Sequence, residues 1–209
     1  MPEPIGFAIK TLVRASLLAC LLALPSVGAA QLQENDQLGA FRLAAATPLG
    51  RTGNLADPGP YFGFEHYWHV RRDIGVGAMI GYHGFREKPI NFGSRGKGSG
   101  TIQVFTMAPV VRYNFTPGYE LVPFIAGGPA LNRIRLRSAF ANGNIPEEDE
   151  SFWRLGIVGS AGFDYFFEQN WTLGLEISGQ TLASDLASFT AGIRIGYKFT
   201  SFGLGGFGL

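Results

Sequence analysis

The sequence has 209 residues with 17 basic and 16 acidic side chains, so its formal net charge is only +1. A chain of this size forms one domain, and it lacks the basic excess of a nucleic-acid-binding protein. Because 13% of the residues are aromatic, 30 are glycine and no uncharged apolar run is long enough for a membrane-spanning helix, the chain is either a secreted β protein or a membrane β-barrel.

Residues 1–30 have the layout of a secretory signal peptide. Two basic residues precede an apolar stretch at 15–27, and small residues follow at 28–30. We expect cleavage after Ala30, which removes the only cysteine, Cys20, and leaves 15 basic and 15 acidic side chains. The mature chain would then have no disulfide or thiol chemistry. An uncleaved membrane helix and a lipoprotein attached at Cys20 are the alternatives.

Strand-sized segments punctuated by turn residues fill the rest of the chain. The sequence predicts β-strands at 39–47, 61–71, 74–85, 101–115, 121–137, 152–167, 171–180 and 187–199. The second, fourth and sixth strands are followed by short links, whereas the longest links, 86–100 and 138–151, follow the third and fifth. Bacterial membrane barrels have an even number of strands, short periplasmic turns and longer outer loops. We therefore predict an all-β fold, an eight-stranded antiparallel transmembrane β-barrel at 31–199, preceded by a cleaved signal peptide and followed by a glycine-rich tail at 200–209.

Apolar and polar side chains alternate along these strands, and a period of two places them on opposite faces. In 121–137, for example, Phe124 and Ile134 alternate with Arg133 and Arg135. We expect the apolar face of every strand to meet lipid and the charged face to point into the lumen. The lumen is then expected to hold a network of salt bridges from Arg42, Glu65, His69, Arg112, Arg133, Arg135, Arg154, Asp164, Glu176 and Arg194.

A secreted soluble barrel of the lipocalin type is the structural alternative. Its apolar face would point inward, but an eight-stranded barrel has barely enough room for ordinary side chains, and here the apolar faces are rich in large aromatics. Trp68, Trp153 and Trp171 also lie near predicted strand ends, where membrane barrels carry aromatic girdles. The membrane barrel is therefore the better interpretation.

Three segments have the pattern of known barrel strands: 111–115, 122–128 and the alternating stretch 191–199. Over residues 38–199 the chain resembles the small outer-membrane β-barrel proteins, the group that includes OmpX-, OmpA- and OmpW-like barrels. The resemblance implies a bacterial outer-membrane location, with lipopolysaccharide and the barrel-assembly machinery as partners. It also implies that Tyr197 and Phe199 form the assembly signal at the end of the closing strand. Such proteins usually end on that aromatic residue, whereas here ten residues follow it.

For function, we expect a structural or surface-interaction role, with an extracellular ligand reached through the loops 86–100 and 138–151. A narrow conduit for small or apolar molecules and a lipid-modifying enzyme are the alternatives. We expect no catalytic, cofactor or metal site. All three histidines lie in the first half of the chain, without a serine partner that recommends a catalytic triad, and His66 and His69 project to opposite faces of one strand.

The arginines at 133, 135 and 137 allow two readings. They could bind anionic groups such as lipid phosphates near the outer rim. The interpretation that we prefer is that they pair with Glu65 or Glu176, or with the acidic run at 147–150.

Overall fold

The computed structural model describes residues 32–50, 56–88, 90–91, 97–140, 148–183 and 186–200. The predicted signal peptide and most of the predicted tail lie outside these residues. No helix in the described ranges is long and apolar enough to cross a membrane. The strands are β1 (Gln37–Leu49), β2 (Ala56–Asp57), β3 (Gly59–His69), β4 (Ile74–Glu87), β5 (Ile90–Asn91), β6 (Lys97–Asn114), β7 (Leu121–Phe140), β8 (Glu148–Phe166), β9 (Trp171–Ala183) and β10 (Leu186–Phe199).

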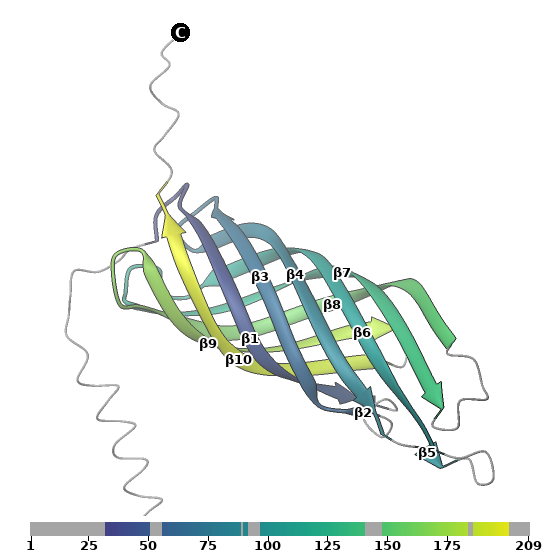
Figure 1. Ribbon diagram of the computed structural model, residues 1–209. Coiled ribbons are helices and arrows are strands. Elements are labelled where there is room, and N and C mark those ends of the chain that lie inside the picture. Colours follow the sequence, from purple (N-terminus) through teal and green to yellow (C-terminus); the bar gives the residue numbers. More distant parts are fainter. Residues whose placement is uncertain are drawn as a thin grey trace, which may run out of the picture.

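The eight long strands form a closed antiparallel barrel (Figure 1). Neighbours in the sequence pair with each other, and the cylinder closes where β1 pairs with β10 over thirteen residue pairs, from Gln37 and Phe199 to Leu49 and Ala187. The two-residue strands β2 and β5 only add short pairings to the outer ends of β4 and β6. The predicted eight-stranded antiparallel barrel is confirmed. Closure matters because it leaves no strand edge within the membrane, where unpaired backbone groups are costly.

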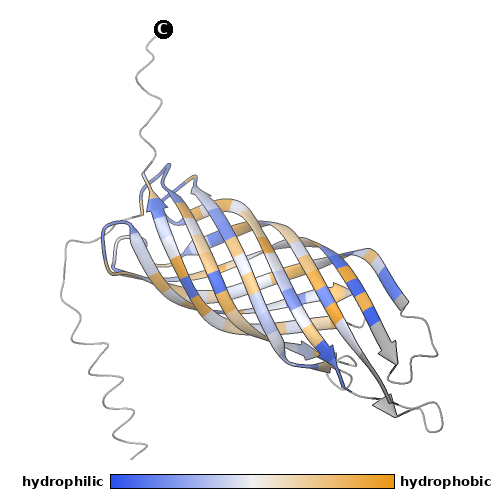
Figure 2. Ribbon diagram, viewed as in Figure 1, coloured by the Kyte–Doolittle hydropathy of each residue, from blue (hydrophilic) through white to orange (hydrophobic). Residues whose placement is uncertain are grey.

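Large hydrophobic side chains are exposed on the lipid-facing side of every long strand and form an apolar belt. Along the strands, hydrophobic and hydrophilic residues alternate (Figure 2). On β7 the outward residues run from Leu121 to Leu131 without a charge. Ten residue steps of about 3.3 Å, tilted by roughly 40°, rise about 25 Å along the membrane normal, which is the height of the apolar band in membrane barrels.

Aromatic side chains border this belt at both ends. Trp68 and Trp171 are about half exposed at the end where β1 begins and β10 ends, and Trp153 is similarly exposed at the opposite end. The three short links, 70–73, 115–120 and 167–170, lie at the same end as Trp68 and Trp171. We take this end as periplasmic because short turns and the chain ends are found there in bacterial barrels.

The strands β6, β7 and β8 extend farther on the outer side than the sequence predicted. Parts of the expected loops 86–100 and 138–151 are strand, because β7 continues to Phe140 and pairs with β8 back to Glu148. By contrast, β8 pairs with β9 only from Val158 to Phe166. A three-stranded sheet therefore continues outward beyond the barrel wall, and in the described residues β8 is its free edge.

The expectation that Arg133 and Arg135 point into the lumen is wrong. The buried residues of β7 all have even numbers: Val122, Phe124, Ala130, Asn132 and Ile134. Arg133 and Arg137 have odd numbers and are exposed, so the arginines lie on the outward face. The error has a physical cause: lipid excludes charge only within the apolar belt, and β7 has no charge there. Its arginines lie above the belt, where the outward face meets headgroups and water.

Candidate functional site

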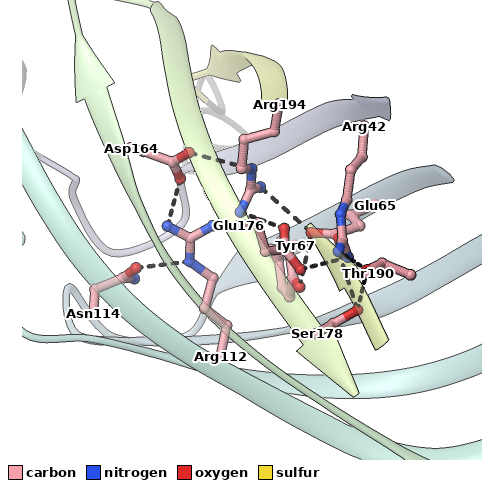
Figure 3. Close-up of polar contacts among 10 residues, drawn as sticks. All are labelled: Arg42, Glu65, Tyr67, Arg112, Asn114, Asp164, Glu176, Ser178, Thr190 and Arg194. Carbon is pink, nitrogen blue, oxygen red and sulfur yellow. Dashed lines mark hydrogen bonds and ion pairs between the residues drawn. The ribbon is translucent and has the colours of Figure 1, made fainter. Parts of the chain in front are cut away.

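Three arginines and three carboxylates form one network across the middle of the lumen (Figure 3). Arg194 from β10 is its centre, and its side chain is 1% exposed. Its guanidinium lies 3.2 Å from Asp164, 3.4 Å from Glu65 and 3.5 Å from Glu176, which belong to β8, β3 and β9. The three positive and three negative charges balance, so the lumen needs no counterion at this level.

Arg42 and Arg112 bind opposite sides of this centre. Arg42 donates to Glu176 at 2.8 Å and to Ser178 at 3.0 Å, and it also contacts the hydroxyl of Thr190. Arg112 donates to Asp164 at 2.6 Å. These bonds join β1, β6, β8, β9 and β10, so the network cross-links strands that are far apart in the sequence.

Polar and aromatic neighbours add further contacts to the charges. Asn114 accepts from Arg112 at 2.7 Å, and the Tyr67 hydroxyl donates to Glu65 at 3.1 Å. The ring of Phe124 lies 3.8 Å from the guanidinium carbon of Arg112 and 4.7 Å from that of Arg194. A guanidinium over an aromatic face is attracted by the ring quadrupole, most strongly where water is excluded. Phe124, which the sequence analysis placed in lipid, therefore stabilises the network from inside.

The periplasmic mouth is closed below the network. Residues 32–36 cross it before β1 begins, with a turn at Asn35 whose φ of 71° suits asparagine. Leu32 packs with Val122 and Phe166 and is fully buried. These residues are held by Lys198, 3.7 Å from the Asp36 carboxylate, and by a contact between His69 and the Asp36 carbonyl.

Two further layers close the lumen above the network. A polar layer links His83, Gln180, Thr106 and Asn132 through contacts of 2.8 to 3.2 Å. An apolar cluster lies near the outer end, formed by Ala46, Ala56, Tyr61, Phe85, Ile102, Val104, Ile134 and Leu182. Glycines at 63 and 81 make room for Tyr61, because a Cβ at either position would come within 3.0 Å of its hydroxyl. In the described residues, apolar and polar layers therefore follow one another along the lumen.

The structure brings six of the ten predicted lumen residues into this network, and it places the other four elsewhere. His69 is buried below it, beside Asp36. Arg154 has the inward orientation but lies on the part of β8 beyond β9, where it is exposed and contacts Phe152. The two remaining residues, Arg133 and Arg135, lie on the outer surface.

Several members of the network were not predicted from the sequence. Ser178, Asn114 and Thr190 each stand two or four residues from a network charge on the same strand, so the period of two could have found them. Phe124 and Tyr67 could not be found in this way, because an aromatic residue is equally expected on the lipid face.

A smaller ion-pair cluster lies outside the membrane, on the extended sheet. Arg135 donates two hydrogen bonds to Asp149, and Arg137 donates a third at 3.4 Å. The hydrogen bonds from Arg135 lower the pKa of Asp149 to about 2. The preferred interpretation, pairing with the acidic run, therefore holds for these two arginines.

The predicted assembly signal lies at the periplasmic end of β10. Phe199 is half exposed on the outward face, and Tyr197 packs between Trp171 and Phe199 at ring-centroid distances of 4.9 and 4.8 Å. This aromatic row faces lipid beside the β1–β10 seam.

Solved structures with the same architecture include outer-membrane proteins of several bacteria. Neisserial surface protein A is 15% identical, with a TM-score of 0.57, covering 79% of this chain and 97% of that one. Ail of Yersinia pestis, in complex with the heparin analogue sucrose octasulfate, is 14% identical, with a TM-score of 0.54 and coverage of 80% and 100%. OprG from Pseudomonas aeruginosa is 13% identical, with a TM-score of 0.54 and coverage of 82% and 99%. Identities this low support the fold alone.

No curated protein matches the sequence. A family model described as "Outer membrane protein beta-barrel domain" matches residues 17–205, which is most of the chain. The chain therefore belongs to the outer-membrane β-barrel family and is a protein of the bacterial outer membrane.

Proposed function

We propose that this protein is a non-conducting outer-membrane barrel with a structural or surface-interaction role. The observation that carries the proposal is the closed lumen: a charge-balanced network lies between packed layers on both sides. Eight strands leave an interior that side chains can fill, and here they fill it. Buried, mutually bonded charges also resist displacement, because an ion that entered would have to replace several salt bridges at once.

The same packing argues against the two alternatives. A conduit needs a continuous path, whereas apolar clusters close both ends of this lumen. A hydrolase triad needs a histidine bonded to a nucleophile. The buried His69 and His83 instead contact the Asp36 carbonyl and Gln180. We therefore propose that the protein is not an enzyme.

Conductance in a planar lipid bilayer tests the closed lumen. We expect no stable single-channel steps from the wild-type protein. A porin reconstituted in the same bilayer is the positive control. Stable steps from the wild-type barrel at neutral pH would overturn the proposal.

The extended sheet favours surface interaction as the specific role. From Asp149 to Arg154, β8 has no recorded pairing with a described strand on its far side, and next to this edge its exposed side chains include Trp153 and Leu155. A free strand edge presents unpaired N–H and C=O groups on which an extended peptide can add as a further strand. Ail, which shares the fold, is known in complex with the heparin analogue sucrose octasulfate, so an extracellular ligand is compatible with this architecture.

Neighbouring proline variants test binding at this edge. Successive N–H groups of a strand point to opposite sides of it. One of the two variants, Ser151→Pro or Phe152→Pro, therefore removes a donor from the free edge, and the other removes a hydrogen bond to β7. Cells that produce each variant are panned with displayed extended peptides. We expect the edge variant to stay folded and to lose peptides that the wild type retains, with Ser151→Ala as the control. Equal peptide retention by both folded variants would contradict strand addition.

We also propose that the end of β10 contacts the barrel-assembly machinery. The outward aromatic pair Tyr197 and Phe199 supports this, together with the position of β10 at the seam. Replacing both with alanine should lower the amount of folded barrel in cells, whereas Phe189→Ala, at the other end of the same face, should have less effect. Equal folded levels in all three strains would exclude this role.

A further inference from the structure

Four neighbouring strands place one outward residue each in register with one another. Tyr82 pairs with Phe105, Phe105 with Arg133, and Arg133 with Trp153. On β7, Arg133 follows directly after Leu131, the last apolar residue of the outward face. Its guanidinium therefore lies where acyl chains end and headgroups begin, and the exposed Trp153 is its direct partner on the neighbouring strand. Aromatic residues prefer this interface.

The charge of Arg133 is not neutralised by the described part of the protein. No described carboxylate lies within 4.0 Å of its guanidinium, and its recorded contact is with the ring of Trp153, at 6.0 Å from the centroid. Directly above it on the same face, Arg135 and Arg137 share the single carboxylate of Asp149. On the described outward face of β7 and β8, three arginines therefore stand near the one carboxylate of Asp149.

We propose that Arg133, supported by Arg135 and Arg137, binds a phosphate group of lipid A, the lipid part of lipopolysaccharide, in the outer leaflet. The inference rests on the proposed surface role and gives it a partner. A guanidinium matches a phosphate with two parallel hydrogen bonds. Lipid A carries its phosphates without a neighbouring amine, whereas a zwitterionic phospholipid has its own ammonium group beside the phosphate. Arg133, which has no described carboxylate within 4.0 Å, therefore fits lipid A better.

Titration of the folded, full-length protein in detergent micelles tests this site. The probes are labelled diphosphoryl lipid A, the same lipid after enzymatic removal of its phosphates, and phosphatidylglycerol. We expect the wild type to bind diphosphoryl lipid A most tightly. Arg133→Gln should weaken that binding about fivefold, the usual effect of one arginine near an anionic lipid surface. Arg133→Lys, which keeps the charge, should retain most of the affinity.

The matched control is Arg71→Gln, which changes the net charge equally but lies in a periplasmic turn, paired with Asp73. It should bind as the wild type does. Equal affinity for the two forms of lipid A, equal affinity for phosphatidylglycerol, or the same loss in Arg71→Gln would each overturn the proposal. Heat-modifiable migration on a detergent gel confirms folding of each variant. Because conductance does not depend on Arg133, failure of this site is distinguishable from failure of the closed-lumen proposal.

Discussion

At the scale of single residues, the network around Arg194 shows how charge is tolerated inside a barrel that lipid surrounds. Moving a charged group out of water costs several kcal/mol, and only bonded partners offset this cost. Each guanidinium here has at least one carboxylate within 3.2 Å, and aromatic rings cover the remaining faces. A shift in register between two of these strands would separate some of the partners.

The contact between Arg112 and Asp164 gives the first prediction. Arg112→Leu alone should lower the free energy of unfolding by about 3–5 kcal/mol, since it leaves a buried carboxylate short of a partner. The double variant Arg112→Leu with Asp164→Leu should cost less than the sum of the two single changes. Urea unfolding in lipid vesicles measures all four proteins. Strict additivity would show that the two side chains are not coupled.

Asp149 gives a prediction about pH. The hydrogen bonds from Arg135 hold the Asp149 pKa at about 2, below its ordinary value of 3.8. A lowered carboxylate pKa stabilises the folded state above the ordinary value, and this contribution is lost as pH falls through the folded pKa. The outer part of the β7–β8 pair should therefore stay ordered at pH 4 and loosen between about pH 4 and pH 2. Carbon-13 NMR of the Asp149 carboxyl group measures this titration.

A matched variant, Arg135→Gln, checks the cause. It should return the Asp149 pKa toward its ordinary value, apart from the weaker effect of Arg137. An unchanged pKa in Arg135→Gln would assign the shift to another group.

At the scale of elements, β7 is a strand whose outward face crosses the whole belt and continues into headgroups and water. The third prediction compares the same substitution at two depths on this face. Ile125→Arg, near the middle of the belt, should cost about 2–4 kcal/mol of unfolding free energy, and Leu131→Arg, at its border, about 0–1 kcal/mol. Unfolding in lipid vesicles measures both. Equal costs would mean that β7 does not have the orientation described above.

At the scale of the whole molecule, closure between the first and last strands determines the behaviour of the barrel. Closed barrels pair all their backbone groups within the membrane, so the fourth prediction is that boiled and unboiled samples migrate differently on a detergent gel. Outward Ala45 and Ala191 are direct partners across the β1–β10 seam. After substitution of Cys20, cysteines at 45 and 191 should form a disulfide in the folded protein. Cysteines at 45 and 161, which lie on β1 and β8, should not.

The sequence by itself determined the strands and most of their faces. All eight predicted segments coincide with long strands within a few residues, because turn residues punctuate them and a period of two marks their faces. Some strands carry a charged residue at the depth of the apolar belt, as β1, β8 and β9 do with Arg42, Asp164 and Glu176. Because lipid excludes charge, each of these strands can only turn its charged face to the lumen. Those residues could be assigned to the lumen without a structure.

Only the tertiary structure decided the orientation of β7 and the partners of each charge. Between Leu121 and Leu131 this strand is apolar on both faces, so neither orientation places a charge in lipid. Its inward face was selected by neighbours distant in sequence: the guanidinium groups of Arg112 and Arg194 cover Phe124, and Ile134 joins the outer cluster. The pairing of each arginine with its carboxylate likewise depends on strand register and barrel curvature. A single strand's pattern contains neither.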